Sequence, residues 1–586
     1  MPFTNDEIAS TLREVSKLMQ LAGENRFKVI AFDKAAQTIE GLQEDINEYI
    51  QNKNLTDIKG VGKSIAEDIY ALEKTGQMPV LEDFKEKVPE GLVEWLNISG
   101  LGPKNAYKIH KELGISTIEE LKEKIDDGSV ASLSGLGQKS AEKIKKSIEW
   151  MEKFDERCRL DEAEAIAIPI FESLKNLDGV QQIEIAGSFR RGLETIGDID
   201  ILIAAEEDRI SELFDVFTSH ERVTEILGRG DTKSSVRTKE GRQVDLRIVK
   251  PQEFSAALMY FTGSKEHNVV LRQRARDRGM SLNEYGLFKL TDDGDTDFDA
   301  PVEFSSENDI YQKLDLHFVP PELREDRGEF EIYEEQEDFE LVTDEDIRGV
   351  IHAHSTWSDG KYSIREMAEA CIERGYEYLG LTDHSKTAAY AGGLSVDEIK
   401  QQWEEIDELN KEFKETGKDF VIFKGIESDI LADGSLDYED NVLEGFDFVI
   451  ASVHQSLNMP REEMMERMRN AIKNPYTRIL GHPTGRLLLK RNGSDLDLNE
   501  LVALAAEYNT AIEINANPHR LDIDWRFGNK ALEVGMMTSI NPDAHTTEGI
   551  DDIPYGVRIA RKGKYGKDRV LNTKSAEEVR KFFEAR

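Results

Sequence analysis

Three aspartates near the middle of the chain have the spacing of divalent-metal ligands. Asp198 and Asp200 are two residues apart in a run that continues Ile201-Leu202-Ile203, which is typical of a β-strand. Side chains two apart on a strand point to the same side, so both carboxylates aim at one point. Asp245, in a later apolar run, can supply a third ligand. Such a set can hold two Mg²⁺ or Mn²⁺ ions, which assist a 3′-hydroxyl in an in-line phosphoryl transfer.

A Gly-Ser turn ahead of these aspartates strengthens that interpretation. An Asp-x-Asp pair by itself is more often a solvated strand edge. Gly187-Ser188 adds a hydroxyl and exposed backbone N–H groups, and Arg191 can neutralise the charge of the triphosphate as its pyrophosphate departs. Together with the later strand aspartate, the pattern predicts a nucleotidyl-transfer site.

Histidines gathered after residue 350 predict a second metal centre. His352 and His354 have the spacing for joint metal ligation at a strand end. The further candidates, each in a short motif after an apolar run, are Asp359, His384, Glu427, His454, His482, Asp543 and His545. A single histidine is as often structural as it is a ligand, but so many in one region are hard to explain by chance. His519 lies outside the pattern, and we expect it at the surface.

The elements that position these residues differ along the chain. Residues 8–150 have apolar positions at helical spacing, and from residue 183 short strand-like runs alternate with helices, which indicates an α+β domain. After residue 348, short apolar runs alternate with helices for the rest of the chain. That pattern predicts an α/β barrel, whose strands end at one mouth, where the histidines would converge.

A Gly-x-Gly signal occurs three times in the helical region. The pairs are Gly60 and Gly62, Gly100 and Gly102, and Gly135 and Gly137, followed by Lys63, Lys104 and Lys139. Each pair can join two helices by a tight turn whose N–H groups face a phosphate. One copy could be an ordinary helix-to-helix turn, but three copies, each followed by a lysine, favour phosphate binding.

Composition limits the classes of protein that fit. The 586 residues exceed one hydrophobic core, and 39% apolar with 33% charged residues is typical of a globular protein. No apolar run reaches the roughly 18 residues of a membrane span, and the N-terminus lacks the features of a signal peptide. With only Cys158 and Cys371, no disulfide framework or cysteine zinc site is indicated, and we expect a cytoplasmic location. The net charge of −41 argues against nucleic acid as a partner, but local patches and bound cations can reverse the sign locally. A saline cytoplasm is another reading of the acidity.

The residues around the aspartates resemble the nucleotidyltransferase superfamily and, within it, the family X DNA polymerases. The resemblance includes Tyr260-Phe261-Thr262-Gly263-Ser264 and covers about residues 1–318. It implies catalysis by Asp198, Asp200 and Asp245, and nucleotide binding by Gly187, Ser188, Arg191, Gly197, Tyr260, Phe261, Gly263, Asn268 and Arg272. In that family the Tyr-Phe pair packs near the deoxyribose, the asparagine approaches the incoming base and the last arginine lies on the template side.

The histidine set is similar to that of the PHP (polymerase and histidinol phosphatase) family, residue by residue from His352 to His545. The resemblance implies up to three divalent ions, Mn²⁺ or Zn²⁺, in a distorted seven-stranded barrel. It also implies phosphodiester hydrolysis. The expected reaction is 3′→5′ removal of nucleotides, with cleavage at apurinic sites as an additional activity that the sequence does not separate.

The glycine turns resemble helix-hairpin-helix motifs, which bind the DNA backbone without reading its sequence. One departure concerns the lyase activity of some family X repair enzymes, which needs a lysine nucleophile after the first hairpin. This chain has Asp68 there, and aspartate cannot form a Schiff base. Lyase activity by that route is therefore not expected. Lys28 and Lys63 remain as candidate phosphate contacts.

These resemblances predict a multidomain chain. We expect a helical N-terminal DNA-binding domain (1–85), helical fingers with two hairpins (86–152), a nucleotidyltransferase palm (153–258), a thumb (259–318), an acidic linker (319–347) and a PHP domain (348–586). Pro320-Pro321 and an excess of acids suggest the linker.

The function we expect is gap filling by a DNA-directed DNA polymerase in repair, coupled to 3′-end trimming. Its partners would be gapped or nicked duplex DNA and dNTPs, and we expect a monomer without membrane contact. One alternative is a nuclease that uses the polymerase half as a DNA clamp. Another is a scaffold without catalysis, which two complete ligand sets disfavour.

Overall fold

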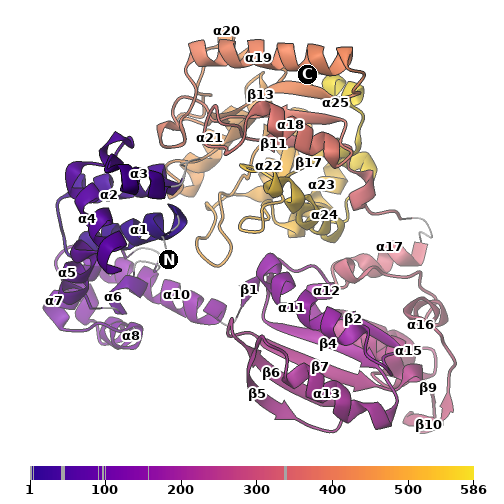
Figure 1. The fold of residues 1–586 in the computed structure, drawn as a ribbon. Coiled ribbons are helices and arrows are strands. Elements are labelled where there is room, and N and C mark those ends of the chain that lie inside the picture. The colour runs from indigo at the N-terminus through magenta and orange to yellow at the C-terminus, as the bar shows by residue number, and fades with distance from the viewer. Residues whose placement is uncertain are drawn as a thin grey trace. The chain divides into compact units, whose positions relative to one another are not determined.

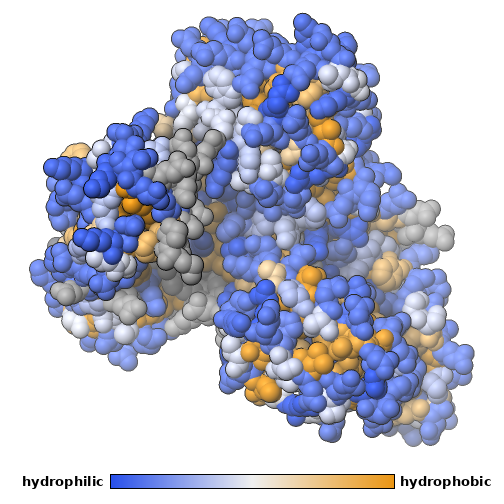
Figure 2. Space-filling model, in the orientation of Figure 1, coloured by the Kyte–Doolittle hydropathy of each residue, from blue (hydrophilic) through white to orange (hydrophobic). Residues whose placement is uncertain are grey.

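The structure is a computed structural model that describes residues 3, 5–40, 46–89, 91–95, 98, 101–155, 157–335 and 339–585. The chain divides into two compact units, Met1–Asp155 and Glu156–Arg586 (Figure 1). The face of the molecule drawn in Figure 2 is largely hydrophilic, with scattered apolar residues. Within the described part of the chain, no helix is long and apolar enough to cross a bilayer.

The described part of the first unit is helical, as its spacing of apolar residues predicts. Its helices are α1 (Asn5–Leu21), α2 (Arg26–Glu40), α3 (Ile46–Asn52), α4 (Lys63–Thr75), α5 (Pro79–Lys87), α6 (Gly91–Glu94), α7 (Pro103–Leu113), α8 (Ile118–Asp126), α9 (Ser129–Ser132) and α10 (Gln138–Asp155). A single apolar core joins them and includes the fully buried Trp95. Thr117 forms a capping box before α8, and its side chain accepts a hydrogen bond from the backbone N–H of Glu120.

The glycine turns share one backbone pattern where they are described. The residue between the two glycines donates its N–H to the carbonyl three residues earlier in all three copies, as Val61 does to Ile58 at 3.0 Å. Gly60 and Gly135 have φ of +92° and +82°, a conformation that other residues rarely adopt. Gly100 lies outside the described residues. The second glycine, for example Gly62, precedes the next helix and faces open space.

The second unit begins with an α+β region. Its elements are β1 (Cys158–Arg159), α11 (Leu160–Lys175), β2 (Gln182–Ile185), α12 (Gly187–Arg190), β3 (Thr195–Ile196), β4 (Asp198–Ala204), α13 (Ile210–Thr218), β5 (Val223–Arg229), β6 (Lys233–Thr238) and β7 (Gln243–Val249). The main sheet has the order β2-β4-β7-β6-β5. Strands β4 and β7 are parallel, and their register sets Asp200 opposite Asp245. The helix α11 covers this sheet through buried residues such as Ile166 and Ile170.

A smaller group of elements follows this sheet. It consists of α14 (Phe254–Thr262), α15 (Lys265–Arg276), the antiparallel strands β8 (Met280–Asn283), β9 (Gly286–Leu290) and β10 (Thr296–Pro301), α16 (Glu307–Lys313) and α17 (Glu329–Glu335). The expected linker at 319–347 is instead a packed segment where it is described. Val319, Leu323, Phe330 and Tyr333 are buried in the same core as α15 and α16. The sequence suggested a linker because acids outnumber these apolar residues, yet the apolar residues recur often enough to pack.

A buried ion network ties this segment to the sheet region. Glu307 receives hydrogen bonds from Arg190 Nη1 at 3.0 Å and Nη2 at 2.7 Å, and from Arg324 Nη1 at 2.7 Å. The Arg324 side chain is fully buried, so its charge depends on Glu307. These two arginines hold the pKa of Glu307 below its ordinary value despite burial, which acts in the opposite direction.

Replacing Glu307 with glutamine should therefore destabilise the chain. The loss leaves a buried guanidinium without its counter-ion, which costs about 3–5 kcal/mol of unfolding free energy. Chemical denaturation of the full chain at pH 7 measures this. Glu303→Gln, at an exposed neighbouring position, serves as the control. Equal midpoints for the two variants would show that the network adds nothing to stability.

The C-terminal part is a barrel of seven parallel strands in chain order. The strands are β11 (Gly349–Ala353), β12 (Tyr378–Leu381), β13 (Val421–Asp429), β14 (Phe448–Ser452), β15 (Thr477–Leu480), β16 (Ala511–Asn515) and β17 (Thr538–Asn541). The helices around them are α18 (Ile364–Glu373), α19 (Val396–Glu415), α20 (Asp440–Leu443), α21 (Arg461–Lys473), α22 (Leu498–Glu507), α23 (Gly528–Val534), α24 (Ile553–Lys562) and α25 (Ala576–Glu584). A bridge between Ala353 and Ala544 joins the first strand to the segment that follows the last strand.

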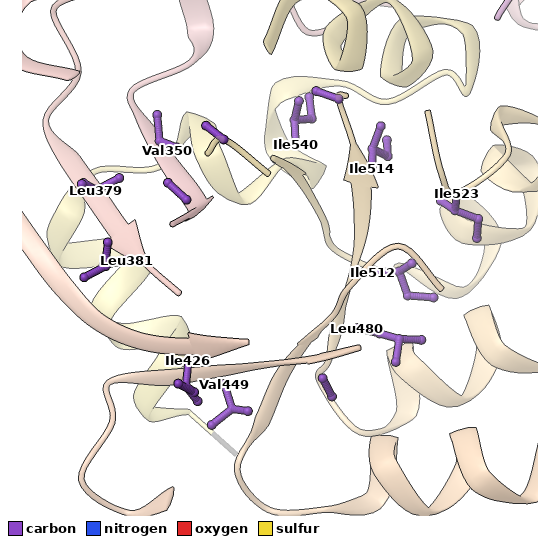
Figure 3. Close-up of a cluster of buried hydrophobic side chains, with 14 of the residues drawn as sticks. Val350, Leu379, Leu381, Ile426, Val449, Leu480, Ile512, Ile514, Ile523 and Ile540 are labelled. Atoms are coloured by element: carbon purple, nitrogen blue, oxygen red, sulfur yellow. The ribbon is translucent and has the colours of Figure 1, made fainter. Parts of the chain in front are cut away.

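Alternating residues on the barrel strands serve two layers. Val350, Leu379, Ile426, Val449 and Ile512 belong to the large core that includes residues of the outer helices, and Figure 3 shows them around the ring of strands. The residues between them form a second apolar cluster with α25: Ile351, Phe423, Phe448, Ile450 and Ile479. Because side chains alternate along a strand, Glu427 and His454 continue the row that contains Phe423 and Ile450 toward the carboxyl ends of the strands.

Candidate functional sites

The three aspartates of the α+β region lie together, as their spacing predicts. One carboxylate oxygen from each of Asp198, Asp200 and Asp245 falls within 4.8 Å of the others. The burial pattern of β4 alternates, with Ile199 and Ile201 buried and the two aspartates on the other face. Burial, and then the carboxylates of Asp198 and Asp245, raise the pKa of Asp200 to about 7. A divalent cation would relieve this repulsion, so the donor set fits a metal ion.

The turn before β4 is shaped by its glycine. Gly187 has φ of +61°, and a Cβ there would collide with the Asp200 carboxylate. Only glycine therefore allows the turn to approach Asp200 so closely. This explains in steric terms why the Gly-Ser pair precedes the two aspartates.

A cavity of about 650 Å³ opens beside the aspartates. Of the predicted nucleotide-binding residues, those that line it are Gly187, Ser188, Arg191, Tyr260, Phe261, Gly263, Asn268 and Arg272. Gly197 does not line it but directly precedes Asp198, which does. The side-chain amide of Asn268 donates to the Tyr260 carbonyl at 2.8 Å, which orients that amide at the wall.

Several residues of this site were not foreseen from the sequence. Lys233 Nζ lies 2.7 Å from an Asp245 oxygen, and Gln243 donates to the other oxygen at 3.0 Å. Arg157 also lines the cavity, and the Arg247 guanidinium lies 4.2 Å from the centre of the Phe261 ring. In the pairing of β6 with β7, Lys233 lies opposite Arg247, two residues from Asp245, and the sequence alone does not show this pairing.

The histidines and acids of the barrel also converge. Three sets of these residues each have oxygen and nitrogen atoms close enough to share an ion. The sets are His354, Asp359, His384 and His545; His352, His354 and Asp543; and His384, Glu427 and His454. His482 Nε2 contacts Glu427 Oε1 at 2.9 Å, which places it beside the third group. Most motifs follow strand ends as expected, but His352 lies within β11 and Glu427 within β13, because β13 extends to Asp429.

The donor atoms of this cluster fit cations. Buried atoms without a hydrogen-bond partner of good geometry include His352 Nε2, His354 Nδ1, His384 Nδ1 and Glu427 Oε2. Unpaired polar atoms are costly in a protein interior, and bound divalent ions would satisfy them. His352, His482 and Asp543 also have φ of +146°, +21° and +53°. Such conformations cost about 1–3 kcal/mol each and persist where the surroundings enforce them, often at functional sites.

A second layer of carboxylates orients the histidines. His352 Nδ1 lies 2.6 Å from Glu513 Oε1, and His454 Nδ1 lies 2.5 Å from Asp429 Oδ1. Such contacts fix the ring and raise its basicity. Sequence reasoning missed both acids. Glu513 could have been found, because it is an isolated charge in the apolar run 511–514 and alternates with Ile512 and Ile514.

Further polar groups border the cluster. Arg520 Nε lies 3.8 Å from an Asp543 oxygen, and the Tyr390 ring centre lies 6.4 Å from that of His384. Asp383 accepts hydrogen bonds from Ser355, Ser358 and Gln402, so it supports the loop after β11. His519 is exposed, as expected.

The histidines of this cluster differ in the direction in which their surroundings shift the pKa. Burial lowers the pKa of His454, but the carboxylates of Glu427 and Asp429 outweigh it and raise the pKa to about 10. In the same way Asp359 and Asp543 raise the pKa of His545 to about 9 against burial. Burial and two neighbouring histidines lower the pKa of His354 to about 3. The metal-free cluster therefore holds protons at pH 7 on some ligands only.

Metal binding to this cluster should release those protons. Ligation requires neutral imidazole, and the pKa values of His352, His454 and His545 are all raised, so ions that bind at pH 7 displace about three protons in total. The apparent affinity for Mn²⁺ should keep rising with pH to at least about 10, the pKa of His454. Calorimetric titration with Mn²⁺ in buffers of different ionisation enthalpy measures the release. Heats that do not depend on the buffer would contradict this expectation.

The predicted DNA-binding lysines are at the surface of the first unit. Lys63, Lys104 and Lys139 are exposed at the first turns of α4, α7 and α10. Lys28 is exposed on α2, 3.4 Å from Glu24. Asp68 lies on α4, where burial and Glu67 raise its pKa.

Comparisons with protein-family models match nearly every part of the chain. The matches are a helix-hairpin-helix domain at residues 3–78, a SAM-like helix-hairpin-helix tandem at 93–149, the DNA polymerase beta palm at 157–249, the DNA polymerase beta thumb at 257–325 and the PHP domain at 351–517.

Comparison with curated proteins gives relatives of both halves. The DNA polymerase/3′-5′ exonuclease PolX of Bacillus subtilis (strain 168) is 40% identical over 578 residues, which is 98% of each chain. DNA polymerase lambda of Rattus norvegicus is 25% identical over 48% of this chain and 49% of its own. A probable phosphatase of Thermoanaerobacter sp. (strain X514) is 28% identical over 38% of this chain and 89% of its own.

Proposed function

Because this chain belongs to the family X DNA polymerases that carry a C-terminal PHP domain, we propose that it fills short gaps in DNA during repair and trims 3′ ends. The observation that carries the proposal is the coexistence of two separate ligand sets. Asp198, Asp200 and Asp245 stand beside a cavity lined by the predicted nucleotide-binding residues. The histidine cluster stands in the barrel.

In the polymerase site, the chain's own residues bind and orient the nucleotide. Two Mg²⁺ or Mn²⁺ ions on Asp198, Asp200 and Asp245 would supply activation of the 3′-hydroxyl and charge stabilisation. Ser188 and Arg191 line the cavity and would bind the triphosphate. Lys233 balances part of the aspartate charge through Asp245.

The base and sugar would contact the other wall of the same cavity. Tyr260 and Phe261, at the end of α14, pack edge to face with ring centres 5.2 Å apart and would support the deoxyribose. Asn268 would face the incoming base, and the exposed Arg272 would face the template. Gly263 permits the turn that passes Arg191.

In the barrel, up to three Mn²⁺ or Zn²⁺ ions would be held by the histidines and acids, and they would supply an activated water and charge stabilisation for phosphodiester hydrolysis. Glu513 and Asp429 hold His352 and His454 in orientation. Arg520 borders Asp543 and would bind a phosphate of the strand being degraded. Cleavage at apurinic sites would use the same groups.

The first unit would grip gapped or nicked duplex DNA through its hairpins. The N–H groups ahead of α4, α7 and α10 have no side chain in front of them at Gly62, Gly102 and Gly137. Backbone N–H groups at helix starts bind phosphates without reading bases. Lys63, Lys104, Lys139 and Lys28 would add charge. Lyase activity is not part of the proposal, because Asp68 replaces the nucleophile.

We also propose the domain boundaries given above, with residues 319–347 assigned to the thumb side as a packed connection, and a monomer as the working form. Apolar residues of that segment share a core with α15 and α16.

One assay tests the proposed function. The full chain is incubated with a gapped duplex carrying a labelled primer, with Mn²⁺, and with or without dNTPs. Extension across the gap with dNTPs, and shortening from the 3′ end without them, are the expected results. Shortening alone in both arms would favour a nuclease that uses the polymerase half as a clamp. No change in either arm would favour a scaffold.

A further inference from the structure

The turn between α12 and β3 contacts the barrel. Glu194 in this turn is nearly buried, and Trp525 Nε1 donates to its Oε2 at 3.1 Å. Arg526 and Arg486 lie 3.5 and 3.6 Å from the other oxygen. The same turn begins with Arg191, which lines the nucleotide cavity. A cavity residue of the polymerase half therefore stands at a contact with the PHP half.

A single lysine of the barrel is central to this contact. Lys562, the last residue of α24, has a fully buried side chain. Its Nζ donates to the carbonyl oxygens of Arg191 and Glu322, both at 3.1 Å, and to Glu325 Oε1 at 2.6 Å. All three ammonium hydrogens thus have acceptors, and the charge is paired. The ammonium also lies 4.5 Å from the centre of the Trp525 ring.

Glu325 connects Lys562 to the Arg191 side chain, because both residues donate to the same carboxylate oxygen. Arg191 Nε donates to Glu325 Oε1 at 3.0 Å, and Arg191 Nη1 donates to the Thr262 carbonyl at 2.6 Å. Arg191 is therefore held at its carbonyl by Lys562, at Nε by a carboxylate that Lys562 shares, and at Nη1 by α14. A long arginine side chain normally loses much rotamer entropy when it binds a phosphate, and such contacts remove that cost in advance.

We propose that Lys562 is a positioning residue for dNTP binding, so that the PHP domain completes the triphosphate site of the polymerase half. The inference rests on the proposed polymerase function. It assigns to the barrel a role in synthesis that is separate from its histidines. Lys562 acts through Arg191 and Glu325 and does not itself line the cavity.

Lys562→Met is the direct test. It removes the ammonium and keeps an unbranched side chain in the buried channel. Because one misplaced binding group can cost up to about 100-fold, we expect the KM for dNTP to rise about five- to twentyfold. The Kd for gapped DNA and Mn²⁺-dependent 3′-end degradation should stay within about twofold, since neither of them requires Arg191.

Lys564→Met is the matched control. Lys564 is also nearly buried at the end of α24, but its Nζ donates to the Arg327 carbonyl at 2.6 Å. Its loss perturbs the same contact region without touching Glu325 or Arg191. We expect a KM for dNTP within about twofold of the wild type, because preorganisation of Arg191 is kept.

A double-mutant cycle separates positioning from a general structural effect. If Lys562 acts through Arg191, adding Lys562→Met to Arg191→Ala should raise KM no further. Additive effects, or an unchanged KM in Lys562→Met, would overturn the inference. Glu325→Gln provides a second variant should Lys562→Met fold poorly, as judged by its exonuclease activity. A wild-type KM for Glu325→Gln would then overturn the inference.

The same experiment distinguishes a failure of the proposed role of Lys562 from a failure of the proposed polymerase function. If the wild-type chain extends primers and the variants match it, the role of Lys562 is wrong and the polymerase function stands. If the wild-type chain extends no primer, the polymerase function is wrong, and the role of Lys562 falls with it.

Discussion

Replacing Asp200 with asparagine should abolish primer extension, with a rate at least about 1000-fold below that of the wild type. Asparagine has nearly the same shape as aspartate, so the collision-free fit against Gly187 is kept. The substitution removes the central charge of the three-carboxylate set. Steady-state extension of a gapped primer with Mg²⁺ or Mn²⁺ measures the loss. Degradation of 3′ ends with Mn²⁺ should remain within about twofold, because in the proposed function the ions for that reaction bind in the barrel.

The control is an acid on the same sheet away from the set. Glu225 lies on the exposed edge strand β5, 3.3 Å from Arg237. Glu225→Gln should extend primers at the wild-type rate. An Asp200→Asn chain that still extends primers would exclude this aspartate set as the catalytic site and with it the polymerase assignment of these residues.

Replacing Glu427 with glutamine should have the reverse effect. Glu427 is almost fully buried and contacts His482, His454 and His384 at 2.9, 3.2 and 3.0 Å. Its neighbours His454 and His352 hold its pKa well below the ordinary value against burial, so it is charged. The neutral amide would weaken the ion-binding set, and Mn²⁺-dependent 3′-end removal should fall at least about 100-fold.

Primer extension by the Glu427→Gln chain should stay within about twofold, since Glu427 and the three aspartates belong to separate ligand groups. Asp433→Asn, at an exposed loop position beyond β13, is the control and should degrade 3′ ends normally. Loss of both activities in Glu427→Gln would mean that the two sites are not independent. Retained degradation would exclude the histidine cluster as the nuclease site.

Much of this architecture could be predicted from two periodicities, the two-residue alternation of strands and the helical spacing of apolar residues. Asp198 and Asp200 are two apart on a strand, which alone places their carboxylates on one face. Asp245 needed one further step, since its pairing with β4 is a property of the sheet, and the register that sets it opposite Asp200 is not visible in either segment. The barrel followed from alternating strands and helices, whereas the order of its strands is a finding of the structure.

The remainder depended on contacts between distant segments. Glu513 is noticeable as an isolated charge in an apolar run, but its contact with His352, 161 positions earlier in the chain, is not visible in the sequence. Lys233 was hidden because a lone lysine on a strand gives no sign of the Asp245 carboxylate that it meets. Composition misled at residues 319–347, where acids dominate the average and Leu323 and Phe330 determine the packing. Averages describe solubility, whereas individual apolar residues determine a core.

The packed character of that same segment has a consequence for traffic between the two centres. A loose linker would let one catalytic domain move to a bound primer, and the length of the linker would set the rate of that movement. Here Arg324 is fully buried and Leu323 nearly so, and both fasten the chain between the centres to the thumb-side core. In the proposed function the mobile partner would then be the nucleic acid, whose 3′ end would unpair and leave the aspartates before it reached the histidines. Mispaired ends unpair more readily than paired ones, so a mispaired terminus would be removed faster than a paired one.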